Sequence, residues 1–107
     1  MNTFVHEAFA DADVVHVLGE VDLSNAADLA NAVLALADES RRVIVDLSGC
    51  SYIDSSTLNV LVHLQGEFGP RLRSVVPERS RLRRLFEIAR LTDVVRLAYS
   101  IEEAREP

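Results

Sequence analysis

The sequence predicts an α/β domain in which an N-terminal β-hairpin is followed by alternating helices and strands. Two strand-like runs open the chain, a β-branched run lies at Val43–Val45, and apolar residues recur at helical spacing in other segments. Such alternation builds parallel strands joined by right-handed helical crossovers. We therefore expect a mixed, mostly parallel sheet packed with about four helices. The 107 residues should form a single domain, residues 1–107.

The N-terminal segment has the pattern of a β-hairpin. Residues 3–9 and 14–18 are strand-like runs on either side of Ala-Asp-Ala-Asp, which is typical of a turn. Gly19 then breaks the pattern.

A first helix is predicted over residues 25–39, with Ser24 as its N-cap. Its large apolar residues, Leu29, Val33 and Leu36, recur at helical spacing. The alanines between them favour a helix and permit close packing on a sheet.

Residues 42–47 form a continuous strand run, which we expect at the centre of the sheet because central parallel strands are buried on both faces. A second helix is predicted over residues 55–65, and Gly66 and Gly69-Pro70 should end it. One face of this helix should be buried and carries Leu58, Leu61, Val62 and Gln65.

The C-terminal third continues the alternation. We expect a strand over residues 72–76, a helix over 79–89, a strand over 94–99 and a short helix over 101–105. The buried stripe of the longer helix should carry Leu82, Leu85, Phe86 and Ala89.

The charge distribution is asymmetric. The net charge is −6, yet residues 71–96 hold eight of the eleven arginines, and the chain has no lysine. An acidic protein with one basic segment is a poor general ligand for nucleic acid, so direct DNA binding is not expected. The basic segment is either a solvated helix face or a surface that meets an acidic protein.

Several classes of protein are not expected. No apolar run approaches the roughly 20 residues that span a membrane, and no secretory signal is visible, so a cytoplasmic protein is the default. Cys50 is the only cysteine, His6, His16 and His63 show no ligand spacing, and no phosphate-binding loop occurs. We expect no metal and no cofactor, and a structural Cys50 in a loop rather than a reactive thiol.

The most informative segment is Asp54-Ser55-Ser56, which follows a glycine-containing turn and opens the second predicted helix. Asp and Ser cap helices because their side-chain oxygens accept hydrogen bonds from the first free N–H groups. A serine at this position also tolerates a phosphate, since the helix dipole favours an anion there. Local chemistry leaves two interpretations open, a helix cap alone or a phosphorylation switch.

Three ordered blocks resemble the STAS domains, and more closely the anti-sigma factor antagonists of bacteria. The first is Gly19-Glu20-Val21-Asp22, and the second runs from Asp46-Leu47-Ser48 to Tyr52-Ile53-Asp54-Ser55-Ser56-Thr57-Leu58-Asn59. The third is Leu82-Arg83-Arg84-Leu85-Phe86, followed by Leu91. The resemblance covers nearly the whole chain and implies the STAS fold.

The resemblance implies a non-enzymatic regulatory phosphoprotein that acts by partner switching in the control of transcription. Unphosphorylated, it would bind an anti-sigma factor of the serine-kinase type and free the sigma factor. The kinase would then modify Ser55, with Ser56 and Thr57 as alternative acceptors, and a serine phosphatase would reset the switch. Residues expected to touch the partner lie near this serine: Glu20, Asp22, Ser24, Asn25, Asp54, Ser56, Thr57 and Asn59.

Other interpretations of these residues remain. Asp54 either caps the helix or orients the Ser55 hydroxyl for a kinase, and residues 20–25 are either a partner-contacting rim or a turn with an N-cap at Ser24. The loops of residues 20–25, 50–57 and 77–81 should form one contiguous surface, because loops after parallel strands gather on one edge.

The chain departs from the family pattern at three glycines, replaced by Thr57, Asn59 and Arg90. We expect Thr57 and Asn59 to be exposed and to tune partner choice, and Arg90 to indicate a different end of its helix. An alternative function is therefore a STAS scaffold that binds a transport ATPase or another assembly without phosphorylation. A small enzyme that uses Asp54 and Ser55 is a third hypothesis, but it lacks a base for the serine.

Overall fold

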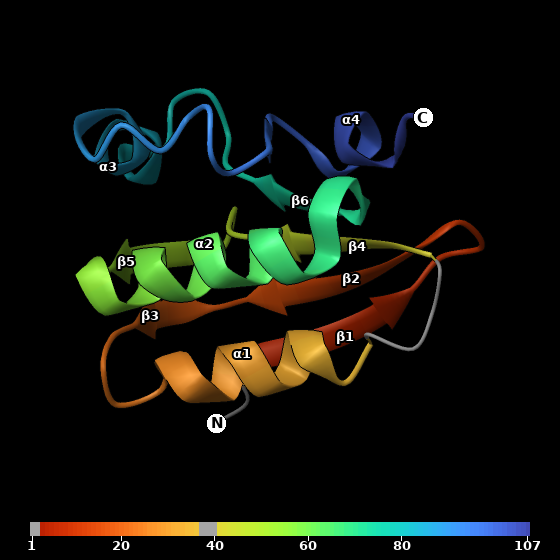
Figure 1. Cartoon of the computed structure of the whole chain (residues 1–107), viewed down its shortest axis with the longest axis horizontal. Coiled ribbons are helices and arrows are strands. Elements are labelled where there is room, and N and C mark those ends of the chain that lie inside the picture. Colours follow the sequence, from red (N-terminus) through yellow and green to blue (C-terminus); the bar gives the residue numbers. More distant parts are fainter. Residues whose placement is uncertain (1–2, 37–40) are drawn as a thin grey trace.

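The computed structural model describes residues 3–36 and 41–107. Its main sheet contains β1 (Phe4–Ala8), β2 (Ala12–Val17), β4 (Arg42–Asp46), β6 (Leu72–Val75) and β7 (Leu97–Ala98). The strands lie in the order β1-β2-β4-β6-β7, of which Figure 1 labels the first four. β1 pairs antiparallel with β2, and every other pair in this sheet is parallel. The predicted hairpin and the mixed, mostly parallel sheet are confirmed.

A second, two-stranded sheet was not predicted. β3 (Gly19–Val21) and β5 (Cys50–Ile53) run parallel to each other beyond the ends of β2 and β4. Gly19 adopts a φ of 78° and donates its N–H to the Gly49 carbonyl at 3.1 Å. The glycine therefore redirects the chain into a new strand rather than ending the strand pattern, because it reaches the left-handed region at low cost. The loop predicted at Cys50 is correspondingly a strand.

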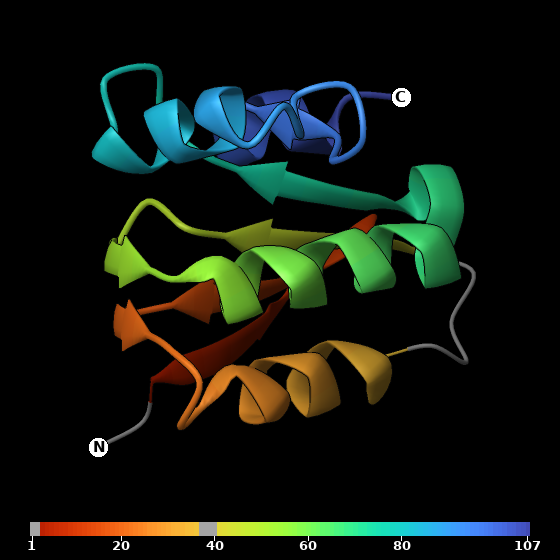
Figure 2. The same ribbon diagram turned by 60° about the vertical axis from the view of Figure 1, so that its left-hand side comes forward.

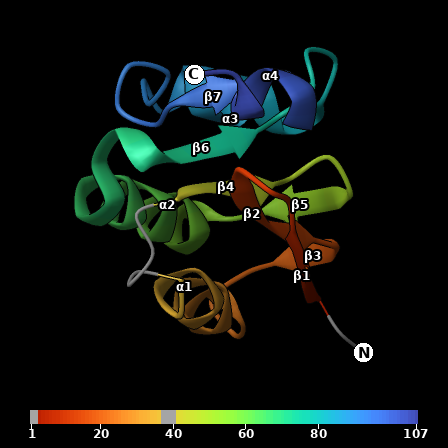
Figure 3. The same ribbon diagram turned by 90° about the vertical axis from the view of Figure 1, so that its right-hand side faces the viewer.

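Three helices contribute to the larger hydrophobic core: α1 (Ala26–Leu34), α2 (Ser55–Phe68) and α3 (Arg81–Ile88). Figure 2 shows α1 and α2 side by side in front of the sheet. The short α4 (Ile101–Arg105) packs on the opposite face (Figure 3), and its Ala104 belongs to a buried cluster with Val14 and Ile44. β4 supplies Val43 and Val45 to one core and Ile44 to the other, so its predicted central position is confirmed.

Several predicted boundaries differ from the structure. α1 has Asn25, not Ser24, at its N-cap, and it ends at Leu34, before a turn at residues 35–36; residues 37–39 of the predicted helix lie outside the described residues. α2 continues through Gly66 to Phe68 and ends where Gly69 adopts a φ of 60°. β7 is shorter than predicted because residues 91–95 form a turn, in which the Val95 N–H bonds to the Leu91 carbonyl at 2.8 Å.

No helix among residues 3–36 and 41–107 is both long and apolar enough to cross a membrane.

Arg90 ends α3 in the manner of a glycine. Its φ is 59°, the Arg90 N–H bonds to Glu87 at 3.0 Å, and the Leu91 N–H bonds to Phe86 at 2.9 Å. These two bonds to backbone carbonyls form the Schellman motif, whose left-handed residue is usually glycine. The expectation that Arg90 indicates a different helix end is wrong, because the hydrogen bonds and the buried Phe86 below them hold an unfavourable backbone conformation.

Replacing Arg90 with glycine should stabilise the domain by about 0.5–1 kcal/mol, because glycine adopts the left-handed conformation without the steric cost that a side chain adds. Thermal unfolding measures the effect. Arg84→Gly, in the middle of α3, is the matched control and should lower the melting temperature. A melting temperature of Arg90→Gly at or below that of the wild type would contradict the prediction.

His16 connects the edge strand β1 to the central strand β4. Its Nδ1 lies 2.7 Å from Asp46 Oδ2, and its Nε2 lies 2.7 Å from Glu7 Oε1. Asp46 also accepts a hydrogen bond from the Ser48 hydroxyl at 2.7 Å. Burial by itself lowers the pKa of His16, but the hydrogen bonds and charges of Glu7 and Asp46 outweigh it, so the pKa is raised above 6.5.

Stability should therefore decrease as the pH rises through the raised pKa of His16, and the contribution of the charged imidazole should be fully present below about pH 6.5. Urea unfolding of the wild type and His16→Gln between about pH 5.5 and 8.5 tests this. The difference in unfolding free energy between the two proteins should shrink with rising pH. The exposed His63 supplies the control variant His63→Gln, which removes a histidine and leaves the contacts of His16 with Glu7 and Asp46 in place. A constant difference for His16→Gln would exclude the charged link.

Candidate functional site

The candidate site is built around the start of α2. Asp54 is the N-cap, with extended backbone, and its Oδ1 accepts the Thr57 N–H at 3.0 Å. Ser55 is the first helical residue, and its side chain is exposed. Ser55 follows directly after β5 and the cap residue Asp54, so it lies at the carboxyl end of that strand. Its hydroxyl is therefore at the positive end of the helix dipole of α2.

Asp54 connects two segments that are far apart in the sequence. Its carboxylate accepts the Ser56 hydroxyl at 2.7 Å and the Leu23 N–H at 3.1 Å, in addition to the Thr57 N–H. The Ser56 hydroxyl lowers the pKa of Asp54 most, the hydrogen bonds from Thr57 and Leu23 lower it further, and desolvation opposes them. Asp54 is thus an ionised helix cap that also holds the loop of residues 22–25 against α2.

The three adjacent hydroxyl groups have different environments. The Ser55 hydroxyl is exposed, and within the described part of the chain it has no hydrogen-bond partner, whereas the Ser56 hydroxyl is bound to Asp54. The Thr57 hydroxyl is fully buried, 3.1 Å from the Val21 carbonyl and 3.0 Å from Asp54 Oδ1. The expectation that Thr57 is exposed is wrong, because its side chain fills the space between β3 and α2. Asn59 is exposed, as expected.

The loop of residues 20–25 holds its own shape through internal hydrogen bonds. Asp22 Oδ1 accepts the Ser24 hydroxyl at 2.6 Å, so Ser24 does not cap α1 as predicted. Asn25 accepts the Asp22 N–H at 2.8 Å and donates to the Glu20 carbonyl at 3.0 Å. These bonds leave Leu23 at the tip with 80% of its surface exposed. Leu23 was not predicted as a functional residue, although an apolar residue within a polar loop is a signal that the sequence contains.

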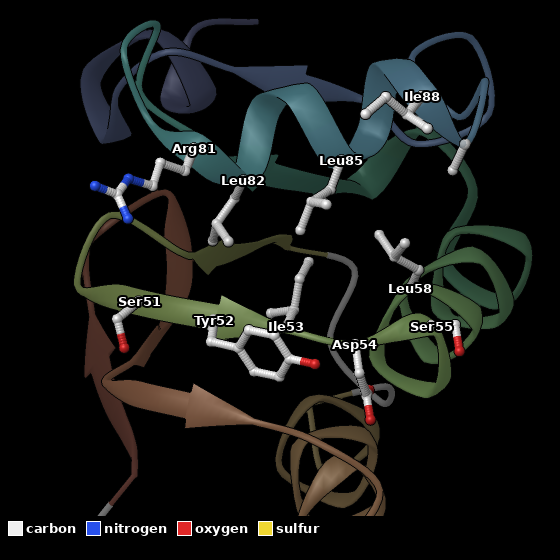
Figure 4. A pocket seen from close by; sticks show the side chains of 11 residues that line it. Ser51, Tyr52, Ile53, Asp54, Ser55, Leu58, Arg81, Leu82, Leu85 and Ile88 are labelled. Atoms are coloured by element: carbon white, nitrogen blue, oxygen red, sulfur yellow. The ribbon is translucent and has the colours of Figure 1, made fainter.

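An apolar groove of about 640 Å³ runs from Ser55 along β5 and α3. Tyr52 on β5, Leu58 on α2, and Leu85 and Ile88 on α3 face it, and Arg81 lies at the end remote from Ser55 (Figure 4). Tyr52 and Ile88 were not predicted to be functional residues. The sequence did contain a signal for Ile88, since it is a large apolar residue outside the predicted buried stripe of its helix and was therefore expected to face solvent.

The structure brings together much of the predicted contiguous surface. Leu23 contacts Asp54 through a hydrogen bond, and Arg81 lines the same groove as Ser51–Ser55. Cys50 is buried beneath this surface, and burial raises the pKa of its thiol, which disfavours the reactive thiolate. Residues 3–36 and 41–107 contain no group of three or more His, Cys, Asp or Glu side chains placed to hold a metal ion.

The chain is similar to several known proteins. The model of a family described as "Mlab, STAS domain" matches residues 5–97. An anti-sigma factor antagonist from Mycobacterium paratuberculosis is 25% identical, with a TM-score of 0.84, over 95% of this chain and 89% of that one. The phosphorylated form of the Bacillus cell fate determinant SpoIIAA is 20% identical, with a TM-score of 0.65, over 94% of this chain and 95% of that one.

Unphosphorylated SpoIIAA, an anti-sigma factor antagonist, also shares the fold, at 16% identity and a TM-score of 0.67, over 94% of this chain and 91% of that one. No curated protein sequence matches the chain. The family match spans most of the chain, and the mixed, mostly parallel sheet with four α-helices in residues 3–36 and 41–107 agrees with the fold that the sequence motifs implied. The chain therefore belongs to the STAS domain family.

Proposed function

We propose that the chain is an anti-sigma factor antagonist controlled by phosphorylation of Ser55. In its unphosphorylated state it binds an anti-sigma factor of the serine-kinase type, and the sigma factor is released. The kinase then transfers a phosphoryl group from ATP to the Ser55 hydroxyl, and a serine phosphatase removes it. The chain acts by binding rather than by catalysis and needs no cofactor of its own, since ATP and magnesium belong to the kinase.

The environment of the three hydroxyl groups is the observation that supports this proposal most. A kinase needs an accessible acceptor, and Ser55 is exposed, whereas Ser56 is bound to Asp54 and Thr57 is buried. Ser55 also has its N–H at the start of α2, where free backbone donors stabilise an anion. The names of the similar proteins support the general function, since they include an anti-sigma factor antagonist and a phosphorylated SpoIIAA.

A phosphate on Ser55 would change the partner surface more than the fold. It adds a charge of about −1.5 to −2 beside the ionised Asp54, on a surface that also carries Glu20 and Asp22. The helix dipole stabilises that charge within the chain, while a partner that approaches closely would have to desolvate it. Phosphorylation should therefore oppose rebinding without unfolding the domain.

Capture of binding proteins followed by a kinase assay tests the proposal. The wild-type chain should retain an anti-sigma factor that, with ATP, adds a single phosphate mapped to Ser55 by tandem mass spectrometry. Ser55→Ala should bind but remain unlabelled, and Ser56→Ala should be labelled like the wild type. Labelling of Ser55→Ala would exclude this acceptor, and capture of a transport ATPase with no phosphate transfer would favour the scaffold function instead.

A further inference from the structure

The groove beside Ser55 leaves apolar side chains facing water. Ile88 and Tyr52 are 67% and 48% exposed, and Leu58 and Leu85, which are half-buried, continue the apolar surface between them. Figure 4 shows these side chains on both walls of the groove, from β5, α2 and α3. An apolar surface that is both continuous and hollowed is typical of an interaction site, in contrast to single exposed leucines.

Ile88 has no evident role in the fold. The helix buries Leu82 and Phe86 in the core, and Ile88 lies outside the core clusters. A polar residue would satisfy an exposed helix position equally well, so folding does not explain an isoleucine there. Its apolar side chain is explained if another molecule covers it.

The charges at the two ends of the groove restrict what fits. Arg81 is the only cationic side chain that lines it, and in the described part of the chain this guanidinium forms neither an ion pair nor a hydrogen bond. At the other end, Asp54 already accepts hydrogen bonds from Ser56, Thr57 and Leu23. The groove thus offers one unpaired positive charge, apolar walls, and a neutral hydroxyl at Ser55.

We propose that the groove receives an apolar segment of the anti-sigma factor, and that an acidic residue of this segment pairs with Arg81. The inference rests on the proposed function and extends its contact surface from the acceptor hydroxyl along the groove to Arg81. The apolar side chains of the segment cover Ile88 and Tyr52, and its carboxylate complements the arginine. The groove reaches Ser55. A segment bound in it would therefore have to desolvate a phosphate on that serine, which would oppose its binding.

Titration calorimetry with the purified anti-sigma factor captured by the wild type tests the inference, at about 50 mM and about 500 mM salt. Ile88→Ala should weaken binding by roughly tenfold or more at both salt concentrations, because it removes apolar contact. Arg81→Gln should weaken binding at low salt and approach the wild type at high salt, because salt screens the charge pair.

Two matched variants control for the position. Leu34→Ala removes a 43% exposed leucine from α1, and Arg84→Gln removes an exposed arginine of α3 that does not line the groove. Both should bind like the wild type. All four substituted side chains are at least partly exposed, and thermal melts check that the variants remain folded.

The outcomes separate this inference from the proposed function. If Ser55→Asp binds poorly while Ile88→Ala and Arg81→Gln bind like the wild type, the groove is empty in the complex and the inference fails alone. If the groove variants bind poorly while Ser55→Asp binds normally, the groove is supported and the phosphorylation switch fails. A wild-type dimer that Ile88→Ala dissociates in sedimentation would assign the groove to a second copy of the chain and overturn the inference.

Discussion

Ser55→Asp is expected to lose at least about tenfold in affinity for the anti-sigma factor while remaining folded. The aspartate places a negative charge at an exposed position beside the ionised Asp54, where a partner would bury two like charges. Within the domain, the same carboxylate lies at the first position of α2 and gains about 0.3–1 kcal/mol from the helix dipole. Calorimetry and thermal unfolding of the same preparation measure both effects.

The control for this prediction is Ser55→Asn, which matches aspartate in size but carries no charge. If charge is what opposes binding, Ser55→Asn and Ser55→Ala should bind much more tightly than Ser55→Asp. Equal losses for the asparagine and aspartate variants would indicate a steric effect. Tight binding by Ser55→Asp would show that this end of α2 lies outside the interface.

Thr57→Gly is expected to destabilise the domain by about 2–3 kcal/mol. The side chain of Thr57 is fully buried, and its hydroxyl lies 3.1 Å from the Val21 carbonyl and 3.0 Å from Asp54. Glycine removes a packed methyl group, leaves the Val21 carbonyl without this partner, and adds backbone freedom to the unfolded chain. Urea unfolding should show a lower midpoint, and the melting temperature should fall by roughly 10 °C.

Asn59→Gly isolates the cost of glycine in the same helix. Asn59 is exposed, so its replacement should cost no more than about 1 kcal/mol. Thr57→Ser, which keeps the hydroxyl and removes the methyl group, should lie between the wild type and Thr57→Gly. Equal stabilities of Thr57→Gly and Asn59→Gly would show that the buried contacts of Thr57 contribute little.

The strand-like runs, together with the helical segments that separate them, were sufficient to predict most of the main sheet. The apolar run Val43–Val45 lies at the centre of β4. The short α4 has the predicted bounds because Ser100 caps it in the ordinary way, accepting the Glu103 N–H at 3.1 Å. The short strands β3 and β5 were missed, since three or four residues carry too little periodicity to distinguish a strand from a turn. Their pairing is a contact between segments about thirty residues apart, which no local pattern contains.

The candidate site was predicted in part. The local capping pattern placed Asp54 and Ser55 at the start of a helix, and the structure agrees. Ser24, by contrast, is a residue type that often caps helices, but its hydroxyl binds Asp22 instead. The shape of this loop depends on a distant contact, because the Leu23 N–H donates to Asp54. The exposed Tyr52 and Ile88 could be recognised as groove residues only in the tertiary structure, because the groove forms where α3 lies beside β5.

The sequence alone determined the order along the chain of the helices and of the main-sheet strands, the central position of β4, and the serine that begins α2, because each depends on residues that are close together in the chain. The tertiary structure decided which of three neighbouring hydroxyl groups is accessible and where the groove lies. Thr57 is buried because β3 packs against it, and Arg90 keeps a left-handed conformation because the packing of Phe86 and Leu91 holds it. Burial and strain of this kind arise from contacts between distant segments, so they are fixed only when the chain has folded.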